Sequence, residues 1–543
     1  MLLRASCSPY VAALIMRSPL SMLLSVALFL VGAQCHAVEQ LTMEEVEVVL
    51  SQAITEASHV DRRAVIAVVD REGFVLGVWS VSGRPPSAGV LAAAVSRAGT
   101  AAFLSSDENA FTSRTAGYII QQHFPVGVRN TPPGPLVGVG FSNLFYSDVN
   151  RFKPGSASLL PVKSSKSPGA RGDQIPLTSL NDSPGGVPLY KNGHLVGGVG
   201  VTGDGSPTNE SAAAAFIHGF SQRSVTSGFK AGSDTDELVA LAGQTGFRPA
   251  TEILASNVLI NGIRIPYVHP RPEDIEDVDD VQPLGSIGAA VSPYEVQGSP
   301  APFPYPSAEL RGVKGELRAS IRDDPIRGKI GKASRLTGEE VEEILGLAAE
   351  RCAITRAAIR LPLGQRAQTF ISVVNHPDKN GVAPTVLGTF RVGEATMFSW
   401  DVSVQKARTA VFFSNKKLAQ SCRTVGFLAQ RFFPPGIDGR PYGPYFGFQE
   451  AVSLKTAPGT TDKRPGNPNL PNGITIFPGG FPLYRKGELI GAIGVSGDGV
   501  DQDDLVAASG CAKFLAPKRI RADRFTYRGA RLPYAKFPRN PEE

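Results

Sequence analysis

Two pairs of basic residues are the most suggestive chemical pattern in the chain, because each pair repeats at a constant separation. Arg97 corresponds to Lys406 and Arg114 to Arg423, and both separations are 309 residues (406 − 97 and 423 − 114). Cations of this kind could hold the carboxylates of a small acid through charge-assisted hydrogen bonds. A structural ion pair or a solvated helix face would explain the same pattern equally well.

A cluster of aspartates near the end of the second repeat could also do chemistry. It follows a glycine-rich stretch, 491–499, and consists of Asp498, Asp501, Asp503 and Asp504. The glycines superficially suggest a phosphate loop, but these carboxylates would repel an anion, and the glycines lie along an expected strand. The cluster could hold a divalent cation, although capping of the helix that follows is the simpler interpretation.

None of the common catalytic motifs is present in the sequence. There is no nucleophile elbow, H-E-x-x-H motif, Walker loop or paired Cys–His set. The sequence therefore favours a binding protein over an enzyme, leaves catalysis open and indicates no particular metal.

The element expected to organise these residues is a β-hairpin that occurs twice. Segments 186–204 and 480–498 align without a gap, 294 residues apart (480 − 186). Alternating apolar residues run into Asn192-Gly193 or Lys486-Gly487, as expected for a two-residue turn with positive φ at both positions. Several glycines leave little side chain on each second strand, so a helix, a partner chain or a ligand could approach the backbone closely; tight internal packing is the simplest case. These glycines are 197, 200 and 203, and 491, 494 and 497.

The hairpin belongs to a longer repeated unit. Each unit opens with a capping-box signal, Thr42 with Glu45 and Thr337 with Glu340, followed by apolar residues at helical spacing. The order in each unit is helix, hairpin, helix, loop, hairpin, helix and a C-terminal extension. Amphipathic helices that cover hairpins predict an α+β fold with an antiparallel sheet. Two similar units would pack as an intramolecular pseudo-dimer with near two-fold symmetry.

The repeats predict the domain boundaries. Residues 38–269 form the first domain, with insertions near 150–171 and 206–232, and 336–543 form the second, with a basic extension. Between them, 270–335 is acidic and Pro-rich, which is typical of a linker.

The first residues predict export. Residues 1–37 carry Arg17, an apolar run and small residues at Cys35 and Ala37, which indicates a cleaved signal peptide and a periplasmic or extracellular protein.

The charge distribution limits the binding partners that can be expected, and the cysteines limit the disulfide and zinc sites. The formal net charge is +6, and Cys511 to the end holds nine Lys/Arg against three Asp/Glu. No aromatic-basic motif of a nucleic-acid module is present, so no nucleic acid is expected, and the tail is either solvated or membrane-facing. Cys352, Cys422 and Cys511 form neither a disulfide framework nor a zinc site, although one disulfide is possible.

The second repeat resembles a known family. Gly479-Gly-Phe-Pro-Leu-Tyr484, the strand that follows, Asp501-x-Asp-Asp504 and the Lys406-Ala-x-Thr409-Ala block are similar to the GlcG/HbpS-like haem-binding family. The resemblance implies two tandem profilin-like α/β/α sandwiches, each with a central antiparallel sheet, and a possible homo-oligomer. It also implies haem or a related tetrapyrrole as cofactor, in haem handling or redox sensing. The tandem arrangement departs from the family's single-domain pattern.

Haem binding would require a protein side chain as ligand to the iron. Haem iron commonly takes His, Cys, Met or Tyr, but no histidine of one repeat is matched by a histidine in the other. If both repeats bind alike, the shared oxygen candidates remain; if only one binds, His123 is the candidate. Arg97, Lys406, Arg114 and Arg423 would then meet propionates. The shared oxygen candidates are Thr100 with Thr409, Thr115 with Thr424, and Tyr190 with Tyr484.

The expected function is therefore an exported haem-binding protein with its pocket at an interface between units. The alternative is an enzyme or accessory protein that acts on a small organic acid, and a third reading is a structural pseudo-dimer without a small ligand.

Overall fold

The computed structural model describes most of the chain after residue 38. The described residues are 39–543 except 121–123, 126–127, 129, 132–133, 137–138, 140–179, 204–233, 270–277, 301–304, 359–363, 380–381, 436, 450–469 and 537–543. The expected signal peptide, both expected insertions and His123 lie outside the described residues.

Residues 41–267 form the first repeat, and its antiparallel sheet has the strand order β3-β4-β1-β2-β7, in which β7 (Ala289–Ala290) comes from the segment that follows the repeat. Its helices are α2 (Met43–Val60), α3 (Ala88–Leu104), α4 (Ser113–Ile119) and α8 (Thr235–Gly243). Its strands are β1 (Val65–Asp70), β2 (Val75–Ser80), β3 (Gly186–Lys191) and β4 (His194–Thr202). Short 3-10 turns η3 (Thr251–Ile253) and η4 (Ala255–Asn257) and the ribbon β5 (Leu259–Ile260) and β6 (Ile263–Arg264) follow.

The second repeat has the same order of elements, and its sheet has the strand order β12-β13-β10-β11-β9-β8, in which β8 (Ser307–Leu310) and β9 (Val313–Ala319) precede the repeat in sequence. Its helices are α9 (Gly338–Ile354), α10 (Phe398–Phe412), α11 (Cys422–Leu428) and α13 (Val500–Gly510). Its strands are β10 (Phe370–Asn375), β11 (Val386–Val392), β12 (Gly480–Arg485) and β13 (Glu488–Ser496). It ends in η6 (Lys518–Ile520), η7 (Ala522–Arg524), β14 (Thr526–Tyr527) and β15 (Ala530–Arg531).

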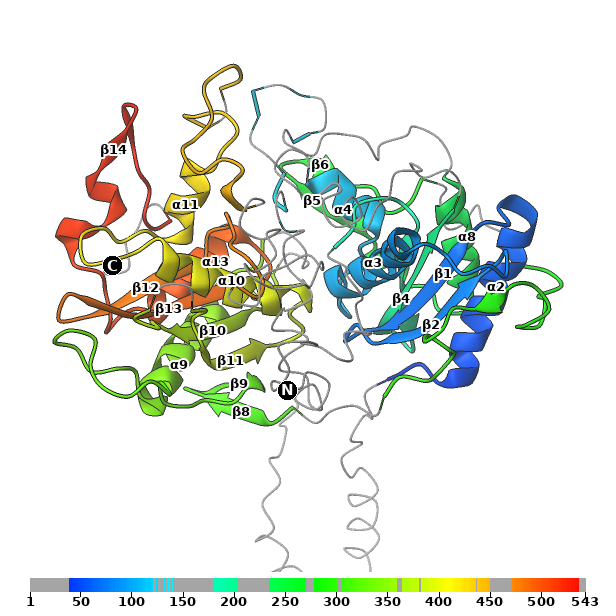
Figure 1. The fold of residues 1–543 in the computed structure, drawn as a ribbon, viewed down its shortest axis with the longest axis horizontal. Helices are drawn as coiled ribbons and strands as arrows, with labels where there is room; N and C mark the ends of the chain where they lie inside the picture. The colour runs from blue at the N-terminus through cyan, green and yellow to red at the C-terminus, as the bar shows by residue number, and fades with distance from the viewer. Residues whose placement is uncertain are drawn as a thin grey trace, which may run out of the picture. The chain divides into compact units, whose positions relative to one another are not determined.

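Each sheet is covered by helices on both faces. In the first repeat α2 and α8 pack against each other and on β1 and β4, while α3 covers the other face of β1, β3 and β4 (Figure 1). In the second repeat α9 and α13 form the paired layer and α10 lies on the opposite face. The predicted pair of tandem α/β/α sandwiches, each with a central antiparallel sheet, is confirmed.

The helix caps and hairpin turns that the sequence predicts are formed with the expected geometry. In both capping boxes the threonine hydroxyl accepts a hydrogen bond from the glutamate N–H, at 3.2 Å for Thr42 and 3.3 Å for Thr337. The first hairpin turns with φ of 51° at Asn192 and 82° at Gly193, and the second repeats this geometry. Both central residues therefore lie in the left-handed region that a type I′ turn requires.

Close packing within each repeat explains the glycines of the second hairpin strand, since Gly197 and Gly491 meet the neighbouring strand and Gly200 and Gly494 meet a helix. A Cβ on Gly494 would lie 2.0 Å from the Ser403 carbonyl oxygen of α10, and one on Gly200 would lie 2.3 Å from the Ala94 oxygen of α3. The close neighbours belong to the same repeat, which is the tight internal packing that was expected as the simplest case.

The segment expected to be a linker contributes strands to both sheets. β7 (Ala289–Ala290) pairs with β2, while β8 (Ser307–Leu310) and β9 (Val313–Ala319) form a hairpin that pairs with β11. Each addition covers a strand whose free backbone groups would otherwise form the sheet edge. Short edge strands need little apolar alternation, which is why the composition of 270–335 did not reveal them.

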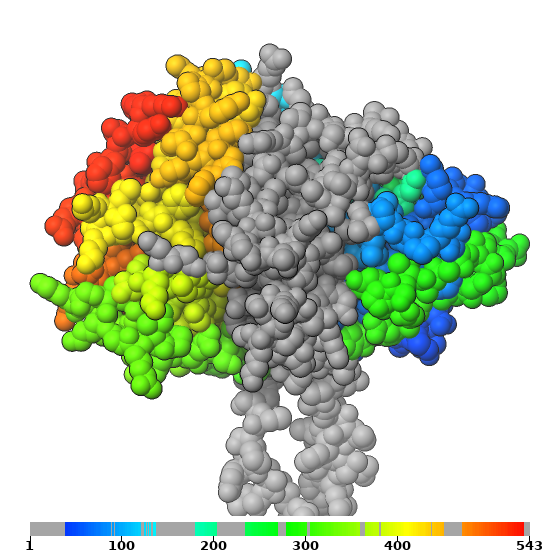
Figure 2. All heavy atoms as spheres, in the orientation of Figure 1, coloured from blue at the N-terminus to red at the C-terminus, as the bar shows by residue number. Residues whose placement is uncertain are grey.

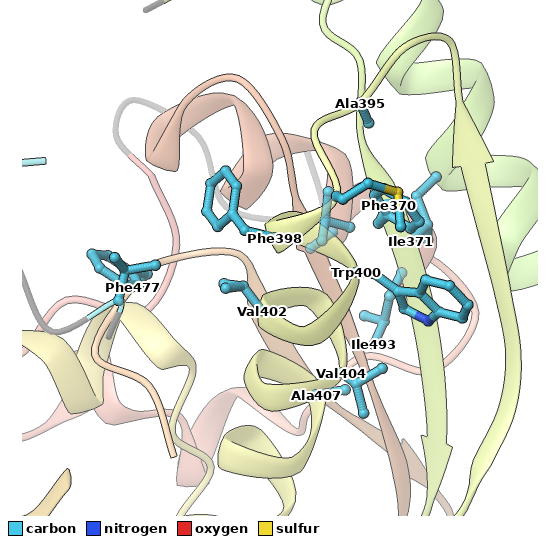
Figure 3. Packing of buried hydrophobic residues seen from close by; sticks show 14 of the residues in the cluster. Phe370, Ile371, Ala395, Phe398, Trp400, Val402, Val404, Ala407, Phe477 and Ile493 are labelled. Atoms are coloured by element: carbon cyan, nitrogen blue, oxygen red, sulfur yellow. The ribbon is translucent and has the colours of Figure 1, made fainter. Parts of the chain in front are cut away.

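Helix α10 is buried all round. Trp400 is fully buried and stacks on Phe370, with ring centroids 6.0 Å apart. In Figure 3 these two rings lie on the sheet side of α10, whereas Phe398, Val402 and Phe477 lie on its opposite side. A second apolar surface therefore faces away from the sheet.

Cys352, Cys422 and Cys511 are free and buried, so the possible disulfide is not formed. Burial raises the pKa of each thiol, which keeps them protonated. Among the described residues, no helix combines the length and apolarity needed to cross a bilayer.

Candidate functional site

The first predicted pair of basic residues forms buried ion pairs. Lys406 Nζ on α10 donates to Asp503 Oδ2 on α13 at 2.8 Å and to the Val495 carbonyl at 2.7 Å. In the first repeat Arg97 Nη1 donates to Asp236 Oδ2 at 2.6 Å. Both cationic side chains are 1% exposed. Each pair ties the helix on one face of its sheet to a helix on the other face.

The second pair is also satisfied within the fold. Arg114 Nε donates to both carboxylate oxygens of Glu237, at 2.8 and 3.0 Å. Arg423 contacts Asp504 and Asp501, each at 2.7 Å. Burial raises the pKa of Glu237 and of Asp504 although each arginine opposes that shift.

These contacts change the interpretation of the aspartate cluster. Capping was expected for it, but α13 begins after Gly499, which offers no side-chain cap. Asp501, Asp503 and Asp504 instead accept hydrogen bonds from Arg423 and Lys406. In the first repeat the cap is present, where Asp234 accepts from the Glu237 N–H. Among the described residues, no group of three or more His, Cys, Asp or Glu is placed to hold a metal ion.

The shared threonines hold helices and loops together. Thr100 donates to the Ser96 carbonyl at 2.7 Å and accepts from the Asn181 N–H at 2.6 Å. Thr409 makes the equivalent bonds to the Gln405 carbonyl and the Thr475 N–H. Thr115 and Thr424 donate to the Pro266 and Pro533 carbonyls. Binding a ligand through any of these hydroxyls would break a bond that both repeats use.

The hydroxyl groups of the shared tyrosines also make hydrogen bonds within the fold. Tyr190 Oη donates to the carbonyls of Ser106 and Asn109 at 2.7 and 2.8 Å. Tyr484 Oη donates to the Asn415 carbonyl at 2.9 Å. Burial raises the pKa of both phenols, which disfavours the phenolate that an iron ligand requires. The binding roles predicted for the repeated polar residues therefore have no direct support in their contacts.

An apolar pocket lies between the two repeats. The space between its atoms is about 520 Å³ including the part open to solvent, and its water-accessible volume is about 40 Å³. The first repeat contributes one wall, lined by Leu104, Phe111, Ile119, Pro135, Leu136 and Val139. The second contributes Phe398, Val402, Phe477 and residues 496–500. Lys406 and Asp503 line the pocket as well, so its charged lining consists of this buried ion pair and Asp498.

Sequence reasoning expected a pocket at an interface between units but did not identify its lining residues, because the two walls do not repeat. Leu104, Leu136 and Val139 line it, whereas residues 309 positions later, Phe413, Tyr445 and Phe448, are not among its lining residues. The available signal was α10 itself, whose apolar residues occupy more than one face, as in a helix buried on all sides.

Ion pairs join the repeats beside the pocket. Arg71 in the β1–β2 turn donates to Glu394 at 2.7 Å, and Arg391 donates to the same carboxylate at 3.3 Å. Arg318 on β9 reaches Glu72 of the first repeat at 3.1 Å. Burial alone would raise the pKa of Glu394, but the cations of Arg391 and Arg71 outweigh it and hold that pKa at about 2.

Acid is therefore expected to weaken the junction between the repeats. Because the folded-state pKa of Glu394 lies below the ordinary glutamate value of 4.5, its pairing stabilises the protein above that pH. The contribution is lost as the pH falls from 4.5 towards 2. Glu394→Gln should lower stability at neutral pH and flatten the acid dependence, measured as the urea midpoint against pH. Glu350→Gln, in an exposed pair with Arg311, is the control; the same acid dependence in Glu394→Gln and the parent would contradict the assignment.

A family model described as "Haem degrading protein HbpS-like" matches residues 41–218 and 353–512. The two matched regions fall on the two repeats and together span more than half of the chain. The chain belongs to the HbpS-like family. The HbpS-like match thus supports the duplication independently of the alignment of the two halves. A search among curated proteins returned no match.

Three solved structures are similar to about one third of the chain each. PduOC in complex with haem is 21% identical, with 34% of this chain and 98% of that chain covered and a TM-score of 0.23. Klebsiella pneumoniae protein ORFY is 22% identical, with 34% and 94% covered and a TM-score of 0.22. A double mutant of Streptomyces reticuli HbpS is 21% identical, with 35% and 96% covered and a TM-score of 0.21. These three similarities do not bear on ligand or activity.

Proposed function

We propose that this HbpS-like chain binds haem in the apolar pocket between its two repeats. The observation that carries the proposal is the pocket itself, whose walls come from both repeats and are mostly aliphatic or aromatic. Apolar walls with a few polar groups at one end are the usual construction of a small-molecule site, typically of about 300–1,000 Å³. The membership in a family described by haem degradation supports haem as the ligand.

The residues present fit haem in part. The walls suit the apolar face of a porphyrin, but the water-accessible volume of about 40 Å³ is room for only about three water molecules. Side chains or the repeats must therefore move apart for the ring to enter. The described lining residues include no His, Met, Cys or Tyr, the common iron ligands. His123, four residues after Ile119 in the sequence, remains the proposed ligand.

The role of the chain's own residues is then to hold and shield the ring. Phe398, Val402 and Phe477 would contact it from the second repeat, and Ile119 and Leu136 from the first, excluding water. Bound haem would supply an iron centre for ligand binding or a change of redox state. Within haem handling, we propose that the protein acts after export, in the periplasm or outside the cell, and redox sensing stays a narrower prediction. Near two-fold packing of the repeats and assembly into a homo-oligomer also stay predictions.

The repeated basic residues no longer support the alternative of a protein that acts on a small organic acid. The four repeated basic residues meet carboxylates of the same fold, at 2.6 to 2.8 Å. A small acid would have to displace one of those internal carboxylates.

Filling the pocket should prevent haem binding. Leu136→Trp places a larger side chain on the first repeat's wall, and Leu136 is half-buried, so the fold should tolerate it. Hemin titration of the full chain should give a Soret change in the parent and none in Leu136→Trp. Tyr445→Trp, at the corresponding position of the second repeat and outside the pocket, is the matched control and should bind as the parent does. Equal binding by Leu136→Trp and the parent would place the haem elsewhere.

A further inference from the structure

The two C-terminal extensions share one backbone but differ in charge. η3, η4, β5 and β6 of the first repeat recur as η6, η7, β14 and β15, and corresponding residues are 267 positions apart (518 − 251). Their turns match too, with φ of 51° at Asn261 and 48° at Arg528. Residues 251–264 hold one acidic and one basic residue, whereas 518–531 hold six basic residues and one acidic residue.

The added charge lies on the surface. Seven positions are exposed in both repeats, and four of them change from neutral or acidic to basic. Because the first repeat builds the same extension without these cations, the fold does not require them. The four changes are Thr251 to Lys518, Glu252 to Arg519, Asn257 to Arg524 and Asn261 to Arg528; Arg264 and Arg531 are basic in both.

Arg528 has a backbone conformation that is unfavourable for arginine. A non-glycine residue at φ 48° is disfavoured, and asparagine is among the few residues that tolerate this region. The first repeat has that asparagine. Arginine at this position therefore adds exposed charge without any gain for the local backbone.

Exposed aromatic residues accompany the cations. Phe525 is 40% exposed and Tyr442 is 54% exposed. Arg528 Nη1 donates to the Tyr442 carbonyl at 2.9 Å, which places both features together. In Figure 2 the red atoms of the extension lie uncovered at the surface. Figure 1 shows β14 and its turn projecting from the second repeat.

We propose that the extension of the second repeat (518–531) together with Tyr442 docks on an anionic phospholipid surface. Basic side chains near an anionic bilayer are attracted to its headgroups, and exposed aromatic rings favour the boundary between headgroups and acyl chains. A projecting ribbon suits a flat surface, whereas single-stranded nucleic acid is usually held in a groove. The surface does not involve the haem pocket, so this proposal stands independently of the proposed function.

The test exchanges the extension's charges for those of the first repeat. The full chain should float with vesicles containing phosphatidylglycerol but not with pure phosphatidylcholine, and salt should weaken the association. The variant Lys518→Thr, Arg519→Glu, Arg524→Asn and Arg528→Asn should bind at least roughly a hundredfold more weakly, because each basic residue contributes about fivefold near such a surface. Its melting temperature should equal or exceed the parent's, since Asn suits position 528, so a loss of binding cannot be attributed to unfolding.

A second variant separates lipid from other polyanions. Phe525→Ser should weaken vesicle binding while leaving retention on heparin unchanged, because only the bilayer accepts the ring. No preference of the parent for phosphatidylglycerol vesicles, or unchanged binding by the fourfold variant, would overturn the proposal. Binding to single-stranded nucleic acid but not to vesicles through the same residues would overturn it in favour of a nucleic-acid surface.

Discussion

Asp503→Leu is expected to lower the free energy of unfolding by about 3–5 kcal/mol, because it leaves a buried ammonium without its partner. Lys406 is 1% exposed and donates to Asp503 at 2.8 Å. The cost of an isolated buried charge greatly exceeds the net value of the pair. Urea unfolding of the haem-free protein measures the loss.

The double variant Lys406→Met with Asp503→Leu identifies the cause. Replacing both partners of a buried pair by apolar residues is often neutral or stabilising, so most of the loss should be recovered. Lys416→Ala, which removes a 68%-exposed partner of Glu488, should change stability by less than about 1 kcal/mol. A double variant no more stable than Asp503→Leu would show that the aspartate matters for some other contact.

Gly494→Ala is expected to cost about 3 kcal/mol or more, since it overpacks the contact between β13 and α10. The new Cβ would lie 2.0 Å from the Ser403 oxygen and 2.5 Å from the Ala407 nitrogen. Both are backbone atoms, so only a shift of the helix relieves the clash. Gly200→Ala should behave alike, because its Cβ would lie 2.3 Å from the Ala94 oxygen and the Ala98 nitrogen.

Gly99→Ala is the matched control for these substitutions. Gly99 lies within α3, and nothing stands within 4 Å of its added Cβ. Alanine should therefore stabilise the helix, by about 1 kcal/mol. Thermal melting of the three variants checks the set, and an unchanged melting temperature for Gly494→Ala would contradict the observed helix–strand contact.

Much of the fold follows from local sequence signals. Thr42 with Glu45 caps a helix, Asn192-Gly193 turns a hairpin, and the glycines of β4 and β13 predict a close neighbour. Each signal acts over a few residues and is repeated in the second half, so the copies support each other. The short strands of 270–335 were not predicted, because their pairing at the sheet edge depends on strands that are distant in sequence.

The candidate site was predicted from the sequence less well than the fold was, for a physical reason. Lys406, Arg423 and Tyr484 were selected because both repeats have equivalents, but what both repeats share is first of all what both need to fold. The pocket is built from different faces of the two repeats, Leu136 on one side and Val402 on the other. A site made of unlike surfaces leaves no repeated pattern in the sequence.

The most direct test of the haem proposal is the number of haems bound by the full chain. The pocket is formed jointly by both repeats, so it occurs once per chain, and hemin titration followed by the Soret band should saturate at one haem per chain. Saturation at two haems per chain, one for each repeat, or no Soret change at all, would contradict a shared site between the repeats.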